Sequence, residues 1–168
     1  TKDQPEEHAK FVKLAEDAVK VINASIADLP ADLTVTTHVC RGNFKSTYLF
    51  ACCYDVVAEY LGQLNYDGLF LEYDNERAGG FAPLTKIWNG NKDKRIVLGL
   101  ITSKFPELED KNEVIDRIHE AAKYVPLENL ALSTQCGFAS TEEGNKLTEE
   151  QQWDKLTLVQ EIAEEVWE

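Results

Sequence analysis

Two spacings of apolar residues alternate along the chain, one typical of helices and the other of buried strands. Apolar residues three and four apart predict helices over residues 6–28, 47–63, 112–125 and 148–168. Short apolar or β-branched runs predict strands over residues 33–39, 66–74, 95–102 and 128–134. The run 95–102 is almost entirely apolar, as expected for a strand that is covered on both faces.

The same spacing assigns inner faces to the helices. In 6–28 the inner positions are Phe11, Leu14, Ala15, Ala18, Val21 and Ile22. In 47–63 they are Val56, Val57, Tyr60 and Leu61, and in 112–125 they are Val114, Ile115, Ile118, Ala122 and Val125. Cys52 and Cys53 then fall within the second helix and are interpreted as packing residues. Thr148 and Gln151 fit a capping box at the start of the last helix.

The order of the predicted elements is αβαβαβαβα, with a strand about every 30 residues, which is the length of one βα unit. Regular alternation predicts a parallel sheet, either doubly wound or part of a (β/α)8 barrel. No GxGxxG segment follows a strand, so a dinucleotide fold has no support. A full barrel needs eight strands and about 250 residues. We therefore expect an α/β fold that is half of such a barrel, with four parallel strands and flanking helices in a single domain over residues 1–168.

Half a barrel leaves two sheet edges open. The chain would then be a fragment of a longer protein, one member of a two-chain barrel, or a self-associating protein. We favour the fragment, because the first residue is not Met and the chain contains no Met.

Composition narrows the classes of partner. A net charge of −13 argues against nucleic acid or an anionic membrane as the main partner. No run of 18 or more apolar residues is present, so no membrane span is expected. The four Cys match no small disulfide scaffold, and we expect a reducing, cytoplasmic location.

Candidate chemistry lies where the strands end, because working residues of parallel sheets and barrels gather there. Ligand-type side chains at these ends are His38 and Cys40 after the first strand, Glu72 and Asp74 after the second, and Cys136 after the fourth. His38 and Cys40 are two apart, so an extended chain turns both to one side. Imidazole, thiolate and carboxylate are ligands that suit zinc.

Each residue also has an ordinary structural interpretation. A lone HxC pair is common by chance, Cys136 could be a small core residue, and Glu72 could pair with Arg77 or Arg41. The joint position of these residues at three strand ends is what favours a metal.

Five segments carry a resemblance to a known family: THVCRGNF (37–44), LEYDNERAGGFAPL (71–84), LGLITSKFPELE (98–109), LSTQCGFASTEEGN (132–145) and EEVWE (164–168). They resemble the carboxyl-terminal half of the cobalamin-independent methionine synthases, and most closely the short bacterial methionine-synthase-like proteins. The resemblance implies a zinc ion at the mouth of a barrel, bound by His38, Cys40, Glu72 and Cys136. It further implies transfer of a methyl group from a methyltetrahydrofolate to the thiol of homocysteine, which yields methionine.

Glu72 is the hardest of the four ligands, and it could exchange with the substrate sulfur, which would give it a catalytic role.

Two departures from the family are visible. The family has a His in an IHS motif after the third strand, thought to help activate the folate leaving group, where this chain has Thr102. The DEPAL-like segment that binds the amino-acid part of the substrate is absent from the sequence. The roles of Arg41, Arg77 and Lys104 stay open at this point.

Three hypotheses follow. The chain belongs to a zinc-dependent thiol methyltransferase, or it is a zinc-binding half-barrel that is inactive without an amino-terminal half or partner chain. A barrel of the uroporphyrinogen-decarboxylase type is a weaker alternative, because that chemistry needs no metal.

Overall fold

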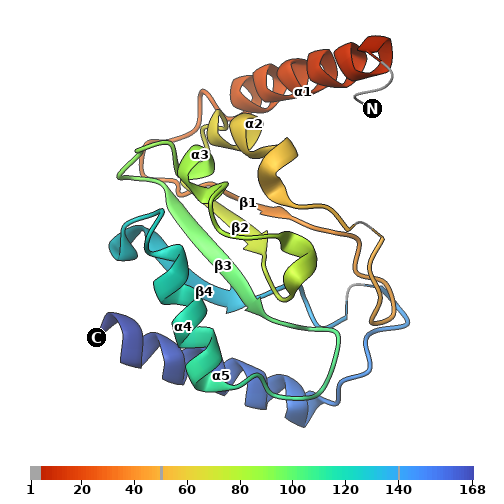
Figure 1. Cartoon of the computed structure of the whole chain (residues 1–168), viewed down its shortest axis with the longest axis vertical. Coiled ribbons are helices and arrows are strands. Elements are labelled where there is room, and N and C mark those ends of the chain that lie inside the picture. Colours follow the sequence, from red (N-terminus) through yellow and green to blue (C-terminus); the bar gives the residue numbers. More distant parts are fainter. Residues whose placement is uncertain (1–4, 50, 140) are drawn as a thin grey trace.

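The structure is a computed structural model that describes residues 5–49, 51–139 and 141–168, and it contains one four-stranded sheet flanked by helices (Figure 1). The strands are β1 (Thr36–Val39), β2 (Gly68–Glu72), β3 (Arg95–Ile101) and β4 (Leu130–Thr134). The α-helices are α1 (Pro5–Ser25), α2 (Ala58–Gly62), α3 (Leu84–Trp88), α4 (Lys111–Ala121) and α5 (Glu149–Trp167). Short 3-10 helices are η1 (Tyr54–Val56), η2 (Glu76–Ala78) and η3 (Leu127–Asn129).

The sheet has the order β1-β2-β3-β4, and every neighbouring pair of strands is parallel. This confirms the predicted βα alternation. It also confirms the four strand positions within a few residues, and α3 occupies a segment for which no helix range was expected. The ladder between β3 and β4 shifts register between Gly99 and Ile101.

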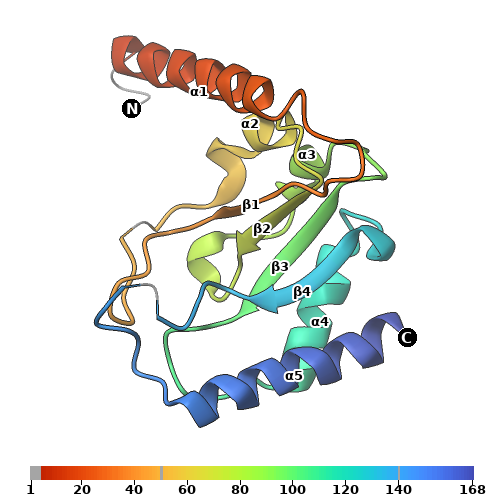
Figure 2. The same ribbon diagram turned by 180° about the vertical axis from the view of Figure 1, so that it is seen from behind.

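The register separates the two faces of the sheet. The outer face carries apolar residues that enter the core, including Leu69, Leu71, Ile96, Leu98 and Leu130, all at most 1% exposed. Ile118 of α4 and Ile162 of α5 belong to the same core. Among the described elements no helix crosses the inner face, which is turned toward the viewer in Figure 2. A sheet covered on one face, whose two edge strands have no further strand beside them among the described residues, is the arrangement expected of half a barrel.

The expected helix over residues 47–63 is wrong in its first half, whereas η1 and α2 fill most of its second half. Among its described residues (Phe50 lies outside them), helix begins only at η1 and α2. The preceding segment is tied as a loop: the Leu49 amide donates to the Arg41 carbonyl at 3.1 Å, and the Arg41 side chain donates to the Cys52 carbonyl. Cys52 is exposed and Cys53 is half-buried, so neither is a helical packing residue. Tertiary hydrogen bonds to Arg41 thus override the local helical spacing.

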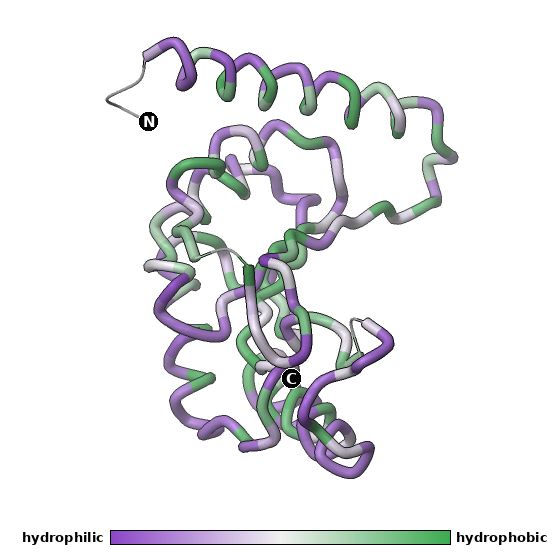
Figure 3. The backbone as a smooth tube through the Cα atoms, turned by 90° about the vertical axis from the view of Figure 1, so that its right-hand side faces the viewer, coloured by the Kyte–Doolittle hydropathy of each residue, from purple (hydrophilic) through white to green (hydrophobic). Residues whose placement is uncertain are grey.

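The first helix itself is confirmed, but its predicted inner face is confirmed only in part, at Ile22, which packs against the core. Phe11, Leu14 and Val21 are 60%, 64% and 69% exposed, and Val19 is the buried residue of α1. Figure 3 shows apolar positions recurring along α1, which lies at one end of the molecule. Val56, predicted to face inward from the second helix, is likewise 64% exposed. Periodicity finds a helix, but it does not say whether the chain contains the surface that covers it.

The later helices agree with their patterns. Val114, Ile118 and Val125 are buried, and α5 begins with the predicted capping box between Thr148 and Gln151. None of the helices within the described ranges is both long enough and apolar enough to cross a bilayer.

Candidate metal centre

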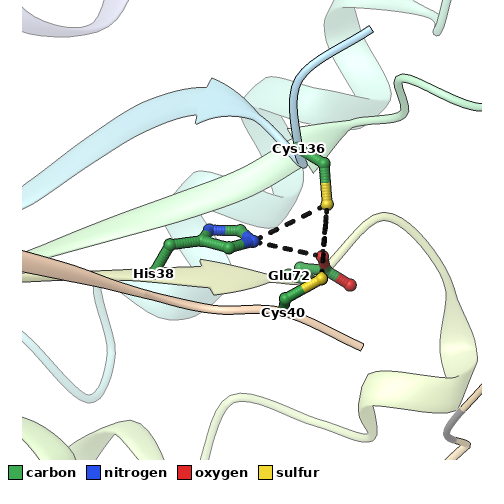
Figure 4. A group of neighbouring side chains, drawn as sticks. All are labelled: His38, Cys40, Glu72 and Cys136. Atoms are coloured by element: carbon green, nitrogen blue, oxygen red, sulfur yellow. Dashed lines mark hydrogen bonds and ion pairs between the residues drawn. The ribbon is translucent and has the colours of Figure 1, made fainter. Parts of the chain in front are cut away.

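The carboxyl ends of β1, β2 and β4 bring four ligand-type side chains into one cluster (Figure 4). One ligand atom from each of His38, Cys40, Glu72 and Cys136 lies within 4.8 Å of all the others. His38 and Glu72 stand on the inner face of the sheet, because His38 pairs with Phe70 and Glu72 follows Phe70 by two residues. The structure therefore brings together the four residues expected to bind zinc, whereas Asp74, the fifth ligand-type residue at a strand end, lies outside the cluster and pairs with Arg77.

The distances are those of a compact polyhedron. His38 Nε2 lies 3.3 Å from Glu72 Oε1 and 3.6 Å from Cys136 Sγ. Cys136 Sγ lies 2.7 Å from Glu72 Oε1 and 3.9 Å from Cys40 Sγ. A tetrahedral zinc ion with bonds of about 2.0–2.3 Å has ligand–ligand edges of about 3.3–3.8 Å. Small movements of these side chains would therefore accommodate the ion, and the residues fit zinc in both type and spacing.

Hydrogen bonds to the Glu72 carboxylate hold the cluster together. Burial by itself would raise the pKa of Glu72, but bonds from His38, Cys136 and Gln135 and the charge of Lys104 lower it to about 2. The bond to Glu72 raises the pKa of His38. Burial, followed by the bond to the Glu72 carboxylate, raises the pKa of the Cys136 thiol far above its usual range. Two protons thus face Oε1 of an ionised carboxylate, where a divalent cation would take their place.

Of the two thiols in the cluster, Cys40 is the one whose surroundings favour ionisation. Burial opposes its ionisation, but the backbone amides of Asn43 and Gly42 donate to its sulfur and lower its pKa. The Gly42 amide lies 3.2 Å from Cys40 Sγ. Gly42 has a φ of 82°, and a Cβ there would come within 2.7 Å of Leu49 Cβ, so the turn that presents this amide requires glycine.

Several buried groups hold Glu72 in place. The Tyr54 hydroxyl accepts from the Glu72 amide at 2.8 Å, and Gln135 Nε2 donates to Glu72 Oε2 at 2.9 Å. Arg77 Nη2 lies 3.9 Å from the same Oε2. Sequence reasoning gave no role to Gln135 and missed Tyr54, because only the tertiary fold brings their side chains to Glu72.

The three basic residues whose roles the sequence left open have different surroundings. Arg41 is a structural residue: it donates to the carbonyls of Cys52 and Arg77, and its guanidinium lies over the Tyr54 ring. Arg77 pairs mainly with Asp74, 3.1 Å away. The ammonium of Lys104 is buried without a hydrogen-bond partner among the described residues, and its charge acts on Asp74 and Glu72.

The cluster opens onto the inner face of the sheet. His38, Cys40 and Cys136 line an open cavity of about 760 Å³ together with Thr36, Thr37, Phe70, Ser133, Thr134, Gln135 and Gly137. His38 keeps 35% of its side chain exposed, whereas Glu72 keeps 1%. A ligand could therefore reach the cluster from the inner face, where no helix of the described chain lies.

Comparison with known proteins agrees with the resemblance. The family model for the catalytic domain of cobalamin-independent synthases matches residues 2–165. Two Bacillus subtilis proteins without an assigned function, YxjG and YxjH, are each 60% identical over 149 residues, which are 88% of this chain and 39% of theirs.

Two solved structures share the fold. A Listeria monocytogenes protein described as a vitamin-B12-independent methionine synthase is 43% identical, with a TM-score of 0.71 over 92% of this chain and 42% of that one. A B12-independent methionine synthase from Shewanella, solved with selenomethionine, is 24% identical, with a TM-score of 0.72 over 93% of this chain and 44% of that one. The latter likeness concerns the fold alone.

The chain thus spans about two-fifths of the length of these relatives. The family match covers nearly all of it, and its four parallel strands with flanking helices form part of a larger barrel. It belongs to the cobalamin-independent methionine synthase family and forms part of that family's catalytic (β/α)8 barrel.

Proposed function

We propose that this chain is the zinc-binding half of a methyltransferase that methylates a homocysteine-like thiol to give methionine. The observation that carries the proposal is the convergence of His38, Cys40, Glu72 and Cys136 within 4.8 Å on the open inner face of the sheet. Membership in the family supports the same reaction class. Because the chain spans about two-fifths of its relatives, the proposal concerns the protein of which it forms a part.

Zinc held by these four residues would supply a Lewis acid that lowers the pKa of a substrate thiol, since the thiolate is the reactive form. Cys40, Cys136 and Glu72 offer three negative charges when ionised, and His38 is neutral as a ligand. Such a donor set would leave a bound sulfur electron-rich. The cavity beside the cluster gives that sulfur a path to the site.

Glu72 is proposed to exchange with the incoming thiol. Its oxygen is the hardest ligand in a set that otherwise offers sulfur and nitrogen, so it is the one that a substrate sulfur should replace most readily. Zinc X-ray absorption with and without homocysteine tests this. Loss of one oxygen and gain of one sulfur neighbour is expected, and an unchanged coordination shell would contradict the exchange.

A methyltetrahydrofolate is proposed as the methyl donor, in line with the family. Thr102 occupies the place of the family's His, and its hydroxyl donates to Gln135 Oε1 at 3.2 Å. A threonine hydroxyl is a poor acid at neutral pH, so any proton that a folate leaving group needs has to come from elsewhere. Assays should therefore include donors that need no such proton, and transfer from those alone would replace the folate proposal.

The second candidate is a half-barrel without activity of its own. It is favoured by the inner face that no described helix covers, the unpaired edges of β1 and β4, and the exposed apolar face of α1. An amino-terminal half is the proposed partner, and a second copy is the alternative. All four Cys are free thiols, which is consistent with the proposed reducing, cytoplasmic location.

Two measurements on the same preparation test these proposals. Metal analysis of the chain should give close to one zinc per chain, and a value near zero would refute both candidates. Homocysteine methylation should then be assayed for this chain alone and after coexpression with the amino-terminal part of a relative such as YxjG. Activity only with the added part supports the half-barrel, and activity of the chain alone removes the need for a partner.

A further inference from the structure

A chain of hydrogen bonds leads from the end of β3 to the rear oxygen of Glu72. The Lys104 amide donates to Thr102 Oγ1 at 3.3 Å, and Thr102 Oγ1 donates to Gln135 Oε1 at 3.2 Å. Gln135 Nε2 then donates to Glu72 Oε2 at 2.9 Å. Gln135 and Glu72 are 2% and 1% exposed, so water does not compete for the bond between them.

The direction of this chain is fixed at both ends. An ionised carboxylate only accepts, so Gln135 must turn its amide nitrogen toward Glu72 and its oxygen toward Thr102. A backbone amide only donates, so the Thr102 hydroxyl accepts from Lys104 and has its own proton free for Gln135. Each donor polarises the next, which strengthens all three bonds.

Thr102 is itself anchored to the last helix. Its amide donates to Glu109 Oε1 at 2.8 Å, and the buried ammonium of Lys155 in α5 lies 3.0 Å from Glu109 Oε2. The Gln135 amide donates to the Ile101 carbonyl at 2.8 Å. Gly99 lets the strands meet this closely, because a Cβ there would lie 2.9 Å from the Leu71 carbonyl oxygen and 3.2 Å from Gln135 Cα.

The two oxygens of Glu72 therefore have different surroundings. Oε2 faces donors, namely Gln135 at 2.9 Å and Arg77 at 3.9 Å. Oε1 faces the other ligand-type atoms, with Cys136 Sγ at 2.7 Å and His38 Nε2 at 3.3 Å.

From this asymmetry we infer that Thr102 and Gln135 are positioning residues that make Glu72 a ligand through Oε1 alone. The inference rests on the proposed zinc site and deepens it. With Oε2 occupied, Glu72 offers one oxygen and leaves the site four-coordinate. It also assigns a role to Thr102 at the place where the family has a His.

The test compares zinc affinity in four variants of the full chain, by competition with a chromophoric chelator. Gln135→Leu removes the bond to Oε2 and should weaken zinc binding about 10–100-fold, the usual effect of losing an outer partner of a ligand. Thr102→Val removes one bond further out and should cost about 2–10-fold. Thr102→Ser keeps the hydroxyl and should restore the wild-type value. Gln160→Leu is the matched control, because Gln160 donates to the Glu164 carboxylate at 2.8 Å at an exposed position of α5.

A spectroscopic readout separates positioning from a general loss of stability. In the cobalt-loaded protein, Gln135→Leu and Thr102→Val should shift the visible absorption toward five-coordination, as Glu72 becomes free to bind through both oxygens. Wild type, Thr102→Ser and Gln160→Leu should keep the four-coordinate spectrum. If Gln135→Leu does not fold, the Thr102→Val and Thr102→Ser pair decides.

The outcomes are distinguishable. Wild-type affinity and spectrum in Thr102→Val and Gln135→Leu would overturn the positioning role while leaving the zinc site intact. Failure of the wild-type chain to bind zinc or cobalt would overturn the proposed function, and the inference with it.

Discussion

Two regions of the molecule differ in how fully the described residues pack around them. One is the cluster at the carboxyl ends of the strands, and the other is the first helix, α1. At the cluster, His38, Glu72 and Cys136 contact one another, and buried groups such as Gln135 hold them from behind. Along α1, Phe11 and Leu14 remain 60% and 64% exposed, and the helix is held mainly at its end, where Asn23 Nδ2 donates to the Gln63 carbonyl at 2.8 Å.

This difference shows which parts of a half-barrel can assemble without the rest of the barrel. Ligands that come from strand ends are assembled by the sheet itself, and β1, β2 and β4 all lie in this half. A helix on the outside of a barrel packs against its neighbours as well as the sheet, and α1 lies beside α2 at one end of the molecule. The four-residue cluster is therefore complete where the outer layer is not.

The largest expected effect is at the cluster. Cys136→Ser should weaken zinc binding on the order of a hundredfold to a thousandfold, since one of four ligands is lost from a total binding energy of about 10–16 kcal/mol. Cys52→Ser, at an exposed thiol in the loop before η1, should bind zinc as wild type does. Equal losses in the two variants, measured by chelator competition, would contradict a site built at the strand ends.

The next largest effect is expected on stability, from a substitution in α4. This helix contrasts with α1 because its apolar residues are buried. Ile118 is fully buried in the core, so Ile118→Ala should lower the free energy of unfolding by about 2–5 kcal/mol. Urea unfolding of the metal-free chain measures this. A loss below about 1 kcal/mol would mean that the outer layer is loosely packed at α4 as well.

The free energy of unfolding should fall in acid mainly because of the cluster. The lowered pKa of Glu72 means that its ionised form stabilises the metal-free chain, by up to about 3 kcal/mol for a change from 4.5 to about 2. This stability is present above pH 4.5 and is lost as the pH falls toward 2.

Urea unfolding between pH 2 and 6 should therefore show wild type and Glu72→Gln converging in acid. Glu59→Gln is the control, because exposed Glu59 pairs with Lys86 at the surface and should change little. If the free energies of unfolding of wild type and Glu72→Gln differed by the same amount at all pH values, the acid sensitivity could not be assigned to Glu72.

The smallest effect is expected on α1. Phe11→Ser should change the free energy of unfolding of this chain by no more than about 0.5 kcal/mol, because the ring is already mostly in water. The same substitution should become costly once an amino-terminal half is coexpressed, if that half covers α1. A large effect in the isolated chain would show that α1 is already covered, for example by a second copy.

Sequence reasoning was most reliable where the residues themselves carry the constraint. The alternation of two periods predicted the parallel sheet, and four ligand-type residues at strand ends predicted a cluster that the structure assembles. Their role as zinc ligands stays a prediction. The first half of the helix predicted over 47–63 was wrong, because the bonds of Arg41 to this segment cannot be read from spacing.

The sequence by itself determined the order of strands and helices, the half-barrel and the identity of the four candidate ligands, because periodicity and strand-end position are local properties. Only the tertiary structure decided which oxygen of Glu72 faces the cluster and that Thr102 and Gln135 hold the other. It also decided that α1 leaves its apolar face in water. Those facts depend on contacts between residues that are far apart in the chain, and in the case of α1 on which of the described residues pack against it.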